Sequence, residues 1–249
     1  MEKRGLTQES LKLIACVTML LDHIGAIVVM ACFENAVAAN RGLLLDLYEV
    51  LRAVGRLAFP IYCFLLAEGA YYTRNPKQYG LRLLIGAILA EIPFDLAFFD
   101  RLTWAHQSVM VTLLLGFTML EVMKKCPNQV TKLLTILFIA VAANVLKTDY
   151  GAKGILTIAL FALTRELPNK GVWQFFGLWC IFSPSHLMAV NWLGGFSVTI
   201  QEWAVLALVP ISMYSGQKHS KSKTLQWAFY LFYPVHIGLL ALLEVLFFE

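Results

Sequence analysis

Charged residues are scarce in this chain of 249 residues. Asp, Glu, Lys and Arg make up 14% of it, against about 25% in soluble globular proteins. Hydrophobic residues make up 59%, the mean hydropathy is +0.69, and apolar stretches of about 20 residues recur from end to end. This composition is too apolar for a water-soluble protein and predicts an all-α, polytopic transmembrane helix bundle. Because little sequence remains for a soluble domain, we expect a single membrane domain over residues 1–249.

Several other sequence features are missing. No two cysteines have CxxC spacing, so neither a disulfide framework nor a zinc site is indicated, and we expect no metal. No basic block with interleaved aromatic residues occurs, which argues against a nucleic-acid partner. The apolar run after Lys3 and Arg4 is too long for the apolar core of a signal peptide, so we expect it to remain as a span.

Nine apolar segments have nearly the length that a bilayer core of about 30 Å requires. The short sixth segment and the boundary near Ser183-Pro184-Ser185 leave eight or ten spans open. Residues 34–53 form the longest outer connection, and the stretch LLLDLYEVL within it is expected to form an interfacial helix. The nine segments are 11–33, 54–73, 80–99, 108–123, 130–146, 152–167, 171–189, 190–214 and 226–247.

The basic residues are distributed unevenly among the expected loops. With the N-terminus in the cytoplasm, fourteen of the twenty Lys and Arg residues fall on the inner side and six on the outer side. Cytoplasmic loops of membrane proteins carry such an excess of Lys and Arg. The bias predicts a cytoplasmic N-terminus and an outer C-terminus, and it also accounts for the modest net charge of +4.

Two ionisable residues, Asp22 and His23, stand in the middle of the first apolar segment. An intramembrane charge costs roughly 2.5–3.5 kcal/mol and marks a candidate functional site. His23 follows Lys12 by eleven residues, about three helical turns, so both lie on one helix face. Asp22 points about 100° away from His23, which makes it a poor orienting partner for that ring. The alternative is structural, with a neutral, hydrogen-bonded His23 and a salt-bridged Asp22.

Further polar residues gather towards the outer half of the expected spans. Glu91 and Asp95 share a helix face at spacing i, i+4, with Pro93 between them. Glu68 lies near an inner end, where a long side chain can extend to the interface. Together these residues predict a polar pocket with a basic cytoplasmic rim, which suits either group transfer across the membrane or proton-coupled transport. The others in this group are Arg56, His106, Asp149, Tyr150 and His236.

Five motifs, in order, resemble those of the TraX family of membrane acetyltransferases, whose named member acetylates the N-terminus of conjugative pilin. The resemblance covers almost the whole chain. The family in turn resembles the acyltransferase-3 group, which carries a basic residue, ten residues and a catalytic histidine in its first span; Lys12 and His23 fit that spacing. The motifs are Asp22-His23, GRLAFPIYCFLLAEGAYYTRNPKQYGLRL (55–83), EIPFD (91–95), TDYGAKG (148–154) and FYPVH (232–236).

The resemblance implies a multi-pass enzyme of a bacterial cytoplasmic membrane that moves an acetyl group from acetyl-CoA to an amine or hydroxyl on the outer side. The acceptor is a pilin N-terminus or another cell-surface substrate, and the remaining partners are membrane lipids. His23 is the expected general base, Asp95 or Asp149 its orienting carboxylate, and Arg56 the oxyanion ligand. The expected catalytic residues are His23, Asp22, Asp149, Asp95 and Arg56; those binding substrate are Glu91, His106, Tyr150, His236 and Glu68; those binding the CoA phosphates are Lys12, Arg74, Lys77 and Arg82.

Two other functions remain open at this level. A proton-coupled carrier of small molecules would use the same carboxylates and histidines as a proton relay. A non-catalytic membrane partner, such as an assembly factor for a surface structure, would use them for packing. The spacing of Lys12 and His23 and the set of motifs favour the acetyltransferase.

Overall fold

The computed structural model describes residues 5–183, 200–217 and 222–248, and every regular element in these ranges is helical. Part of the expected 171–189 and 190–214 segments, with the boundary beyond Ser183, lies outside the described residues. The elements are α1 (Gln8–His23), η1 (Ile24–Val29), α2 (Met30–Asn35), α3 (Ala38–Gly55), α4 (Ala58–Tyr72), α5 (Pro76–Phe99), α6 (Val109–Met123), α7 (Gln129–Val145), α8 (Gly151–Thr164), α9 (Lys170–Phe182), η2 (Ile200–Ala207), α11 (Leu208–Ser212) and α12 (Lys223–Phe248).

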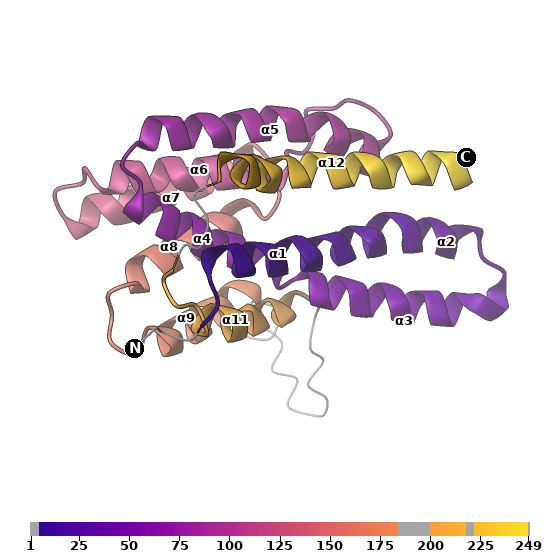
Figure 1. Cartoon of the computed structure of the whole chain (residues 1–249), viewed down its shortest axis with the longest axis horizontal. Coiled ribbons are helices and arrows are strands. Elements are labelled where there is room, and N and C mark those ends of the chain that lie inside the picture. The colour runs from indigo at the N-terminus through magenta and orange to yellow at the C-terminus, as the bar shows by residue number, and fades with distance from the viewer. Residues whose placement is uncertain (1–4, 184–199, 218–221, 249) are drawn as a thin grey trace.

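The N-terminal part of the chain, up to Gly55, forms a long helical hairpin. Helices α1, η1 and α2 follow one another without a break, and α3 returns along all three of them. The stretch expected to form an interfacial helix lies in α3, which instead packs along the first helices. It leads almost directly into α4 to give one apolar run, Ala38–Tyr72, that is long enough to cross a membrane. The hairpin turn lies at one end of the molecule, near the C-terminal end of α12 (Figure 1).

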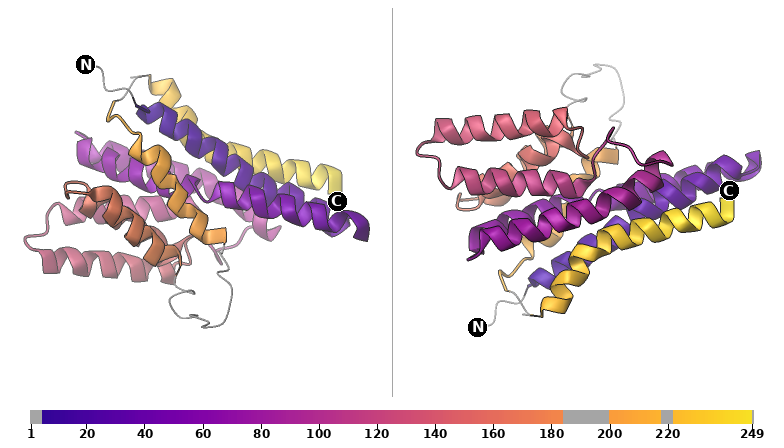
Figure 2. Two further views of the ribbon diagram at one scale, coloured as in Figure 1. Left: turned by 90° about the horizontal axis from the view of Figure 1, so that it is seen from below. Right: turned by 90° about the horizontal axis from the view of Figure 1, so that it is seen from above.

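Most of the remaining helices are shorter and gather at the opposite end, where the chain begins, whereas α12 extends to the hairpin turn (Figures 1 and 2). The α4–α5, α6–α7 and α8–α9 turns lie there too, and because they are rich in Lys and Arg we call it the basic end. α5 packs along α12, and α4 packs with α6 and α8 to form the buried core. Gly116 permits close packing of α6 on α8, since a Cβ there would meet Ile158 at 2.2 Å.

The helices are apolar enough for a membrane protein. Within the described residues, three helical stretches are long and apolar enough to cross a bilayer: Gln8–Asn35, Ala38–Tyr72 and Thr224–Phe248. Four shorter apolar helices accompany them. Each expected segment overlaps a described helix, while the count of nine spans and the cytoplasmic N-terminus stay predictions.

A stretch of π-helix, η1, begins immediately after His23. Such stretches are rare, and many of them lie at functional sites. Here the wider turn changes the register of α2 relative to α1. Gly25 lies within it, and a Cβ at that position would come within 3.1 Å of Leu51 on α3. The first helix is thus both irregular and closely packed at the position of the expected catalytic histidine.

Candidate active site

A cavity of about 900 Å³ runs between α1, α4, α5, α6 and α12. Its lining includes Lys12 and Glu68 near the basic end, and His23 and Asp149 deeper in the molecule. It therefore joins the two ends of the pocket that the sequence predicted as a polar interior and a basic rim. The ionisable residues that line it are Lys12, Asp22, His23, Arg52, Arg56, Glu68, Arg82, His106 and Asp149, with Tyr62, Tyr72, Tyr79, Tyr150, Tyr214, Tyr230 and Tyr233.

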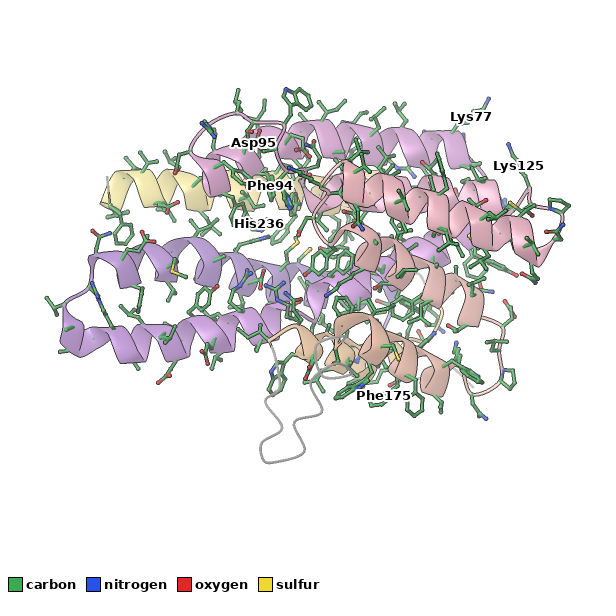
Figure 3. The ribbon with its side chains drawn as sticks, turned by 180° about the vertical axis from the view of Figure 1, so that it is seen from behind. Lys77, Phe94, Asp95, Lys125, Phe175 and His236 are labelled. Carbon is green, nitrogen blue, oxygen red and sulfur yellow. The ribbon has the colours of Figure 1, made fainter. Side chains whose placement is uncertain are left out.

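His23 is paired with a second histidine. Its Nδ1 lies 2.7 Å from Nε2 of His236 on α12, and Nδ1 of His236 lies 2.6 Å from the carbonyl oxygen of Phe232. Figure 3 shows His236 between α12 and α1. The sequence assigned His236 to substrate binding, but the structure places it, rather than Asp95 or Asp149, against the ring of His23.

Asp22 lies between two arginines that extend from the end of α3. Oδ2 of Asp22 is 2.7 Å from Nη1 of Arg52, and Oδ1 is 3.4 Å from Nη2 of Arg56. The carboxylate and both guanidinium groups are largely buried, and the three together carry one net positive charge. Asp22 is thus salt-bridged, as the structural alternative for this residue proposed, and it holds two cations beside His23.

The motif GRLAFP brings α3 against α1. A Cβ on Gly55 would lie 2.2 Å from Cβ and 2.3 Å from Oδ1 of Asp22, so only glycine fits this approach. Arg56 then turns towards Asp22, and its Nη1 also donates to the hydroxyl of Tyr150 at 3.2 Å. Phe59, one turn later, stacks on the ring of Tyr150 with centroids 3.7 Å apart.

The motif TDYGAKG forms the tight turn between α7 and α8. Tyr150 has a φ of +62° and Gly151 a φ of +44°, and these left-handed values swing Asp149 and Tyr150 into the cavity. Asp149 accepts the Tyr150 N–H at 3.0 Å. Burial raises the pKa of the Asp149 carboxyl, and nearby His106 and Arg56 act in the opposite direction.

The carboxylates of EIPFD anchor a loop instead of lining the cavity. Glu91 accepts from the N–H and Oγ of Ser108, at 3.0 and 2.6 Å, and Asp95 accepts from the N–H of Thr103 at 2.8 Å. The loop held in this way carries His106 to the cavity, where it lies between Phe94 and Phe99. The expected roles of Glu91 in substrate binding and of Asp95 in orienting His23 are therefore not supported by their positions.

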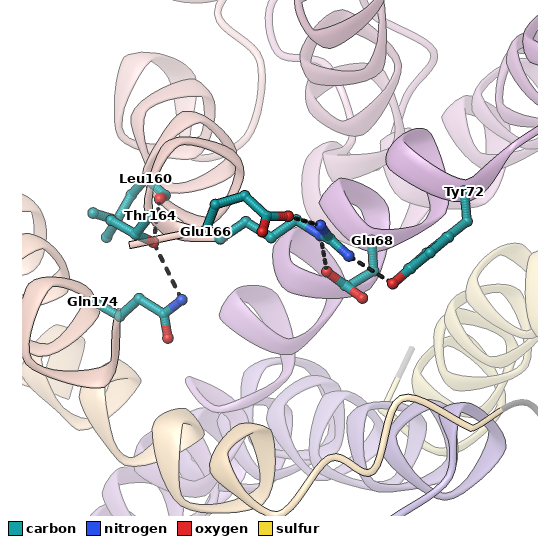
Figure 4. A network of polar contacts seen from close by, with 7 residues as sticks. Glu68, Tyr72, Leu160, Thr164, Glu166 and Gln174 are labelled. Carbon is teal, nitrogen blue, oxygen red and sulfur yellow. Dashed lines mark hydrogen bonds and ion pairs between the residues drawn. The ribbon is translucent and has the colours of Figure 1, made fainter. Parts of the chain in front are cut away.

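Glu68 lines the basic end of the cavity and belongs to an ion-pair network (Figure 4). Nε of Arg165 donates to Glu68 at 2.7 Å, and its Nη2 donates to the hydroxyl of Tyr72 at the same distance. The guanidinium group also lies 3.5 Å from the ring centroid of Tyr71 and contacts Glu166. Glu68 is thus largely buried and paired, where the sequence suggested that it extends to the interface.

Two of the four residues expected to bind phosphate line the cavity. The Nζ of Lys12 lies 5.2 Å from the ring centroid of Phe229, and Arg82 packs over Tyr79 and Tyr230. Arg74 and Lys77 are exposed and do not line the cavity. Figure 3 shows Lys77 extending from the surface, together with Lys125, at the basic end.

Sequence reasoning missed Arg52 and Tyr62. The sequence does hold a signal for Arg52, because it precedes Arg56 by four residues and this spacing places both on one helix face. Tyr62 lines the cavity, and its hydroxyl is 3.1 Å from Sγ of Cys16. Nothing in the sequence signalled that contact. Among the described residues, no three His, Cys, Asp or Glu side chains cluster as metal ligands would.

Comparison with known proteins agrees with the motifs. No solved structure matches the chain. A "Probable fimbrial assembly protein FimC, serogroup H1" from Dichelobacter nodosus is 28% identical over 239 residues, which cover 92% of each chain. The family model described as TraX protein matches residues 7–244 and so includes every motif discussed above. The chain therefore belongs to the TraX family.

Proposed function

We propose that this protein is an integral-membrane acetyltransferase that uses cytoplasmic acetyl-CoA to acetylate an amine or hydroxyl on the outer side of a bacterial cytoplasmic membrane. The observation that carries the proposal is the continuous cavity, which is lined by Lys12 at the basic end and by His23 in the interior. A donor entering at one end and an acceptor entering at the other would meet at His23.

The donor fits the basic end of the cavity. Lys12 and His23 lie on one face of α1, about three turns or 16 Å apart. The flexible arm of acetyl-CoA is long enough to carry the thioester across that distance. Lys12 and Arg82 would hold phosphate oxygens, and the neighbouring rings of Phe229 and Tyr230 offer apolar surface to the nucleotide. This assigns two of the four expected phosphate ligands and leaves out Arg74 and Lys77.

The chemistry would be general base catalysis by the imidazole of His23. Nε2 takes the proton of the acceptor N–H or O–H while the acceptor atom attacks the thioester carbonyl carbon. The tetrahedral intermediate then collapses, the C–S bond breaks, and the CoA thiolate takes the proton back from Nε2. The products are the acetylated acceptor and CoA with a free thiol, so His23 is regenerated without a further reactant.

Arg52, Asp22 and Arg56 would stabilise the charge that develops during this step. The net positive charge of the three side chains stands next to His23 along α1, and the cavity reaches all of them. Fixed cations in a site with little water are effective ligands for an oxyanion, because they need not reorganise as the charge forms. Asp22 would keep both guanidinium groups in place without neutralising them.

The acceptor would enter near the second cluster of cavity residues, formed by His106, Asp149 and Tyr150. A pilin is the candidate that the family resemblance suggests, and the similarity to a probable fimbrial assembly protein agrees with an acceptor from a surface fibre. The same similarity keeps the non-catalytic assembly factor as the second candidate function.

A turnover assay in lipid nanodiscs tests the proposal. We expect release of free CoA from acetyl-CoA when a peptide with a free N-terminus is added, and loss of that release in His23→Ala. Val17→Ala, on an exposed face of the same helix, is the matched control and should retain turnover. Unchanged turnover in His23→Ala would refute the assignment. An assembly factor would show no CoA release in any variant, and a carrier would show pH-driven uptake into vesicles without CoA.

A further inference from the structure

We infer that His236 is the positioning residue for His23, so that the base and its orienting partner form a pair of neutral imidazoles in place of a histidine and a carboxylate. The inference rests on the proposed function for its kinetic consequence, but its structural content is independent of that function. It concerns two rings that are 213 positions apart in the chain.

The hydrogen bonds fix the tautomers of both rings. A carbonyl oxygen only accepts, so Nδ1 of His236, 2.6 Å from the Phe232 oxygen, must carry a proton. In a neutral ring the Nε2 of His236 is then an acceptor. Nδ1 of His23, 2.7 Å from that Nε2, must therefore be the donor. The lone pair of His23 consequently lies on Nε2, the nitrogen that a general base needs to have free.

The nearby carboxylates are already engaged elsewhere. Asp22 is held by Arg52 and Arg56, Asp95 by the N–H of Thr103, and Asp149 accepts from the N–H of Tyr150. Aromatic rings enclose the histidine pair: Tyr233 stands edge-on to His23, with centroids 5.9 Å apart, and Phe232 stacks on His236 at 4.7 Å. Within the described part of the chain, His236 is thus the group that restrains the imidazole of His23.

The pair would also share the proton that His23 acquires. When Nε2 of His23 takes a proton from the acceptor, the ring becomes cationic and its Nδ1–H bond to His236 strengthens. The Nδ1 proton can then move to Nε2 of His236, which leaves His23 neutral and His236 cationic. The reverse transfer precedes protonation of the CoA thiolate. No proton is lost from the pair, because the Nδ1–H of His236 keeps its hydrogen bond to the Phe232 carbonyl oxygen throughout.

Nitrogen-15 NMR of histidine-labelled protein in nanodiscs tests the tautomers without any assay of activity. A His23→Gln variant identifies the His23 signals by their absence. We expect protonated Nδ1 and unprotonated Nε2 for His23, and the same tautomer for His236. A His23 ring protonated on Nε2 alone, or a His236 ring protonated on both nitrogens, would overturn the inference.

Two substitutions at 236 separate positioning from packing. In His236→Asn the side-chain amide can still donate to Phe232 but does not reach His23, whereas the longer amide in His236→Gln places its oxygen near the original Nε2. We expect kcat to fall about 100-fold in the Asn variant and to return to within about tenfold of wild type in the Gln variant, with the KM for acetyl-CoA nearly unchanged in both.

The neighbouring buried substitution Ile237→Val controls for packing of α12 and should keep the wild-type kcat. The comparison requires that the wild type is active and that both variants fold. Equal kcat values in the Asn and Gln variants, whether high or low, would then overturn the inference. Absence of turnover in wild type would instead remove the proposed function, and the NMR result would still decide the tautomers.

Discussion

Gly55→Ala is the most specific structural test of the site, because one added methyl group meets the backbone-proximal part of Asp22. The new Cβ would lie 2.2 Å from Cβ of Asp22, whereas ordinary contact begins at 3.4 Å. The end of α3 must therefore move away from α1 by roughly 1.2 Å, the difference between these distances. Overpacking of this kind costs about 1–3 kcal/mol, and a misplacement of about 1 Å in a catalytic site can cost about 100-fold in rate.

We expect the variant to have a melting temperature lower by about 4–8 °C for a loss of about 2 kcal/mol, and a kcat lower by about 100-fold. Gly42→Ala is the matched control, since it lies in the same helix and a Cβ there would meet nothing within 4 Å. It should raise stability by about 0.5–1 kcal/mol, because alanine is the better helix former. Differential scanning fluorimetry and the CoA-release assay measure both effects. Equal behaviour of the two variants would refute the close approach of α3 to Asp22.

Four further predictions concern ionisable residues in and around the site. Asp22→Asn leaves Arg52 and Arg56 without their carboxylate partner and should destabilise the protein by about 3 kcal/mol. In thermal melts, the double variant Asp22→Asn with Arg52→Gln should recover part of this loss, because it removes one of the two unpaired charges. Lys12→Ala should raise the KM for acetyl-CoA about tenfold with kcat unchanged. Lys77→Ala, outside the cavity lining, should alter neither constant. Equal effects of the two substitutions would contradict the role of Lys12 in binding the CoA phosphates. Glu91→Ala frees the Ser108 N–H and hydroxyl and should cost about 1–3 kcal/mol in thermal stability, while His106→Ala should lower turnover with a smaller loss of stability.

The order of the helices could be predicted from the sequence because membrane spans have a local signal. Apolar length is a property of one segment, and each expected segment overlaps a helix. The π-helix after His23 could not be predicted in this way. α3 packs closely against Gly25 within it, and that contact joins two helices that no local pattern links.

The candidate site was predicted only in part for a similar reason. The position of His23 and its spacing from Lys12 are properties of one helix, and the cavity includes both. The partners of the polar groups come from distant segments: His236 for His23, Ser108 for Glu91 and Arg165 for Glu68. A sequence shows that a buried carboxylate needs a partner, but not which residue supplies it. Glu91 and Asp95 were therefore assigned to chemistry although they hold a loop.

A cryo-EM structure in nanodiscs with a nonhydrolysable acetyl-CoA analogue tests the account most directly. With the phosphates near Lys12 and Arg82, we expect the arm to follow the cavity and the carbonyl carbon of the analogue to lie next to Nε2 of His23. An analogue bound outside the cavity, or one whose carbonyl lies far from that nitrogen, would contradict the account.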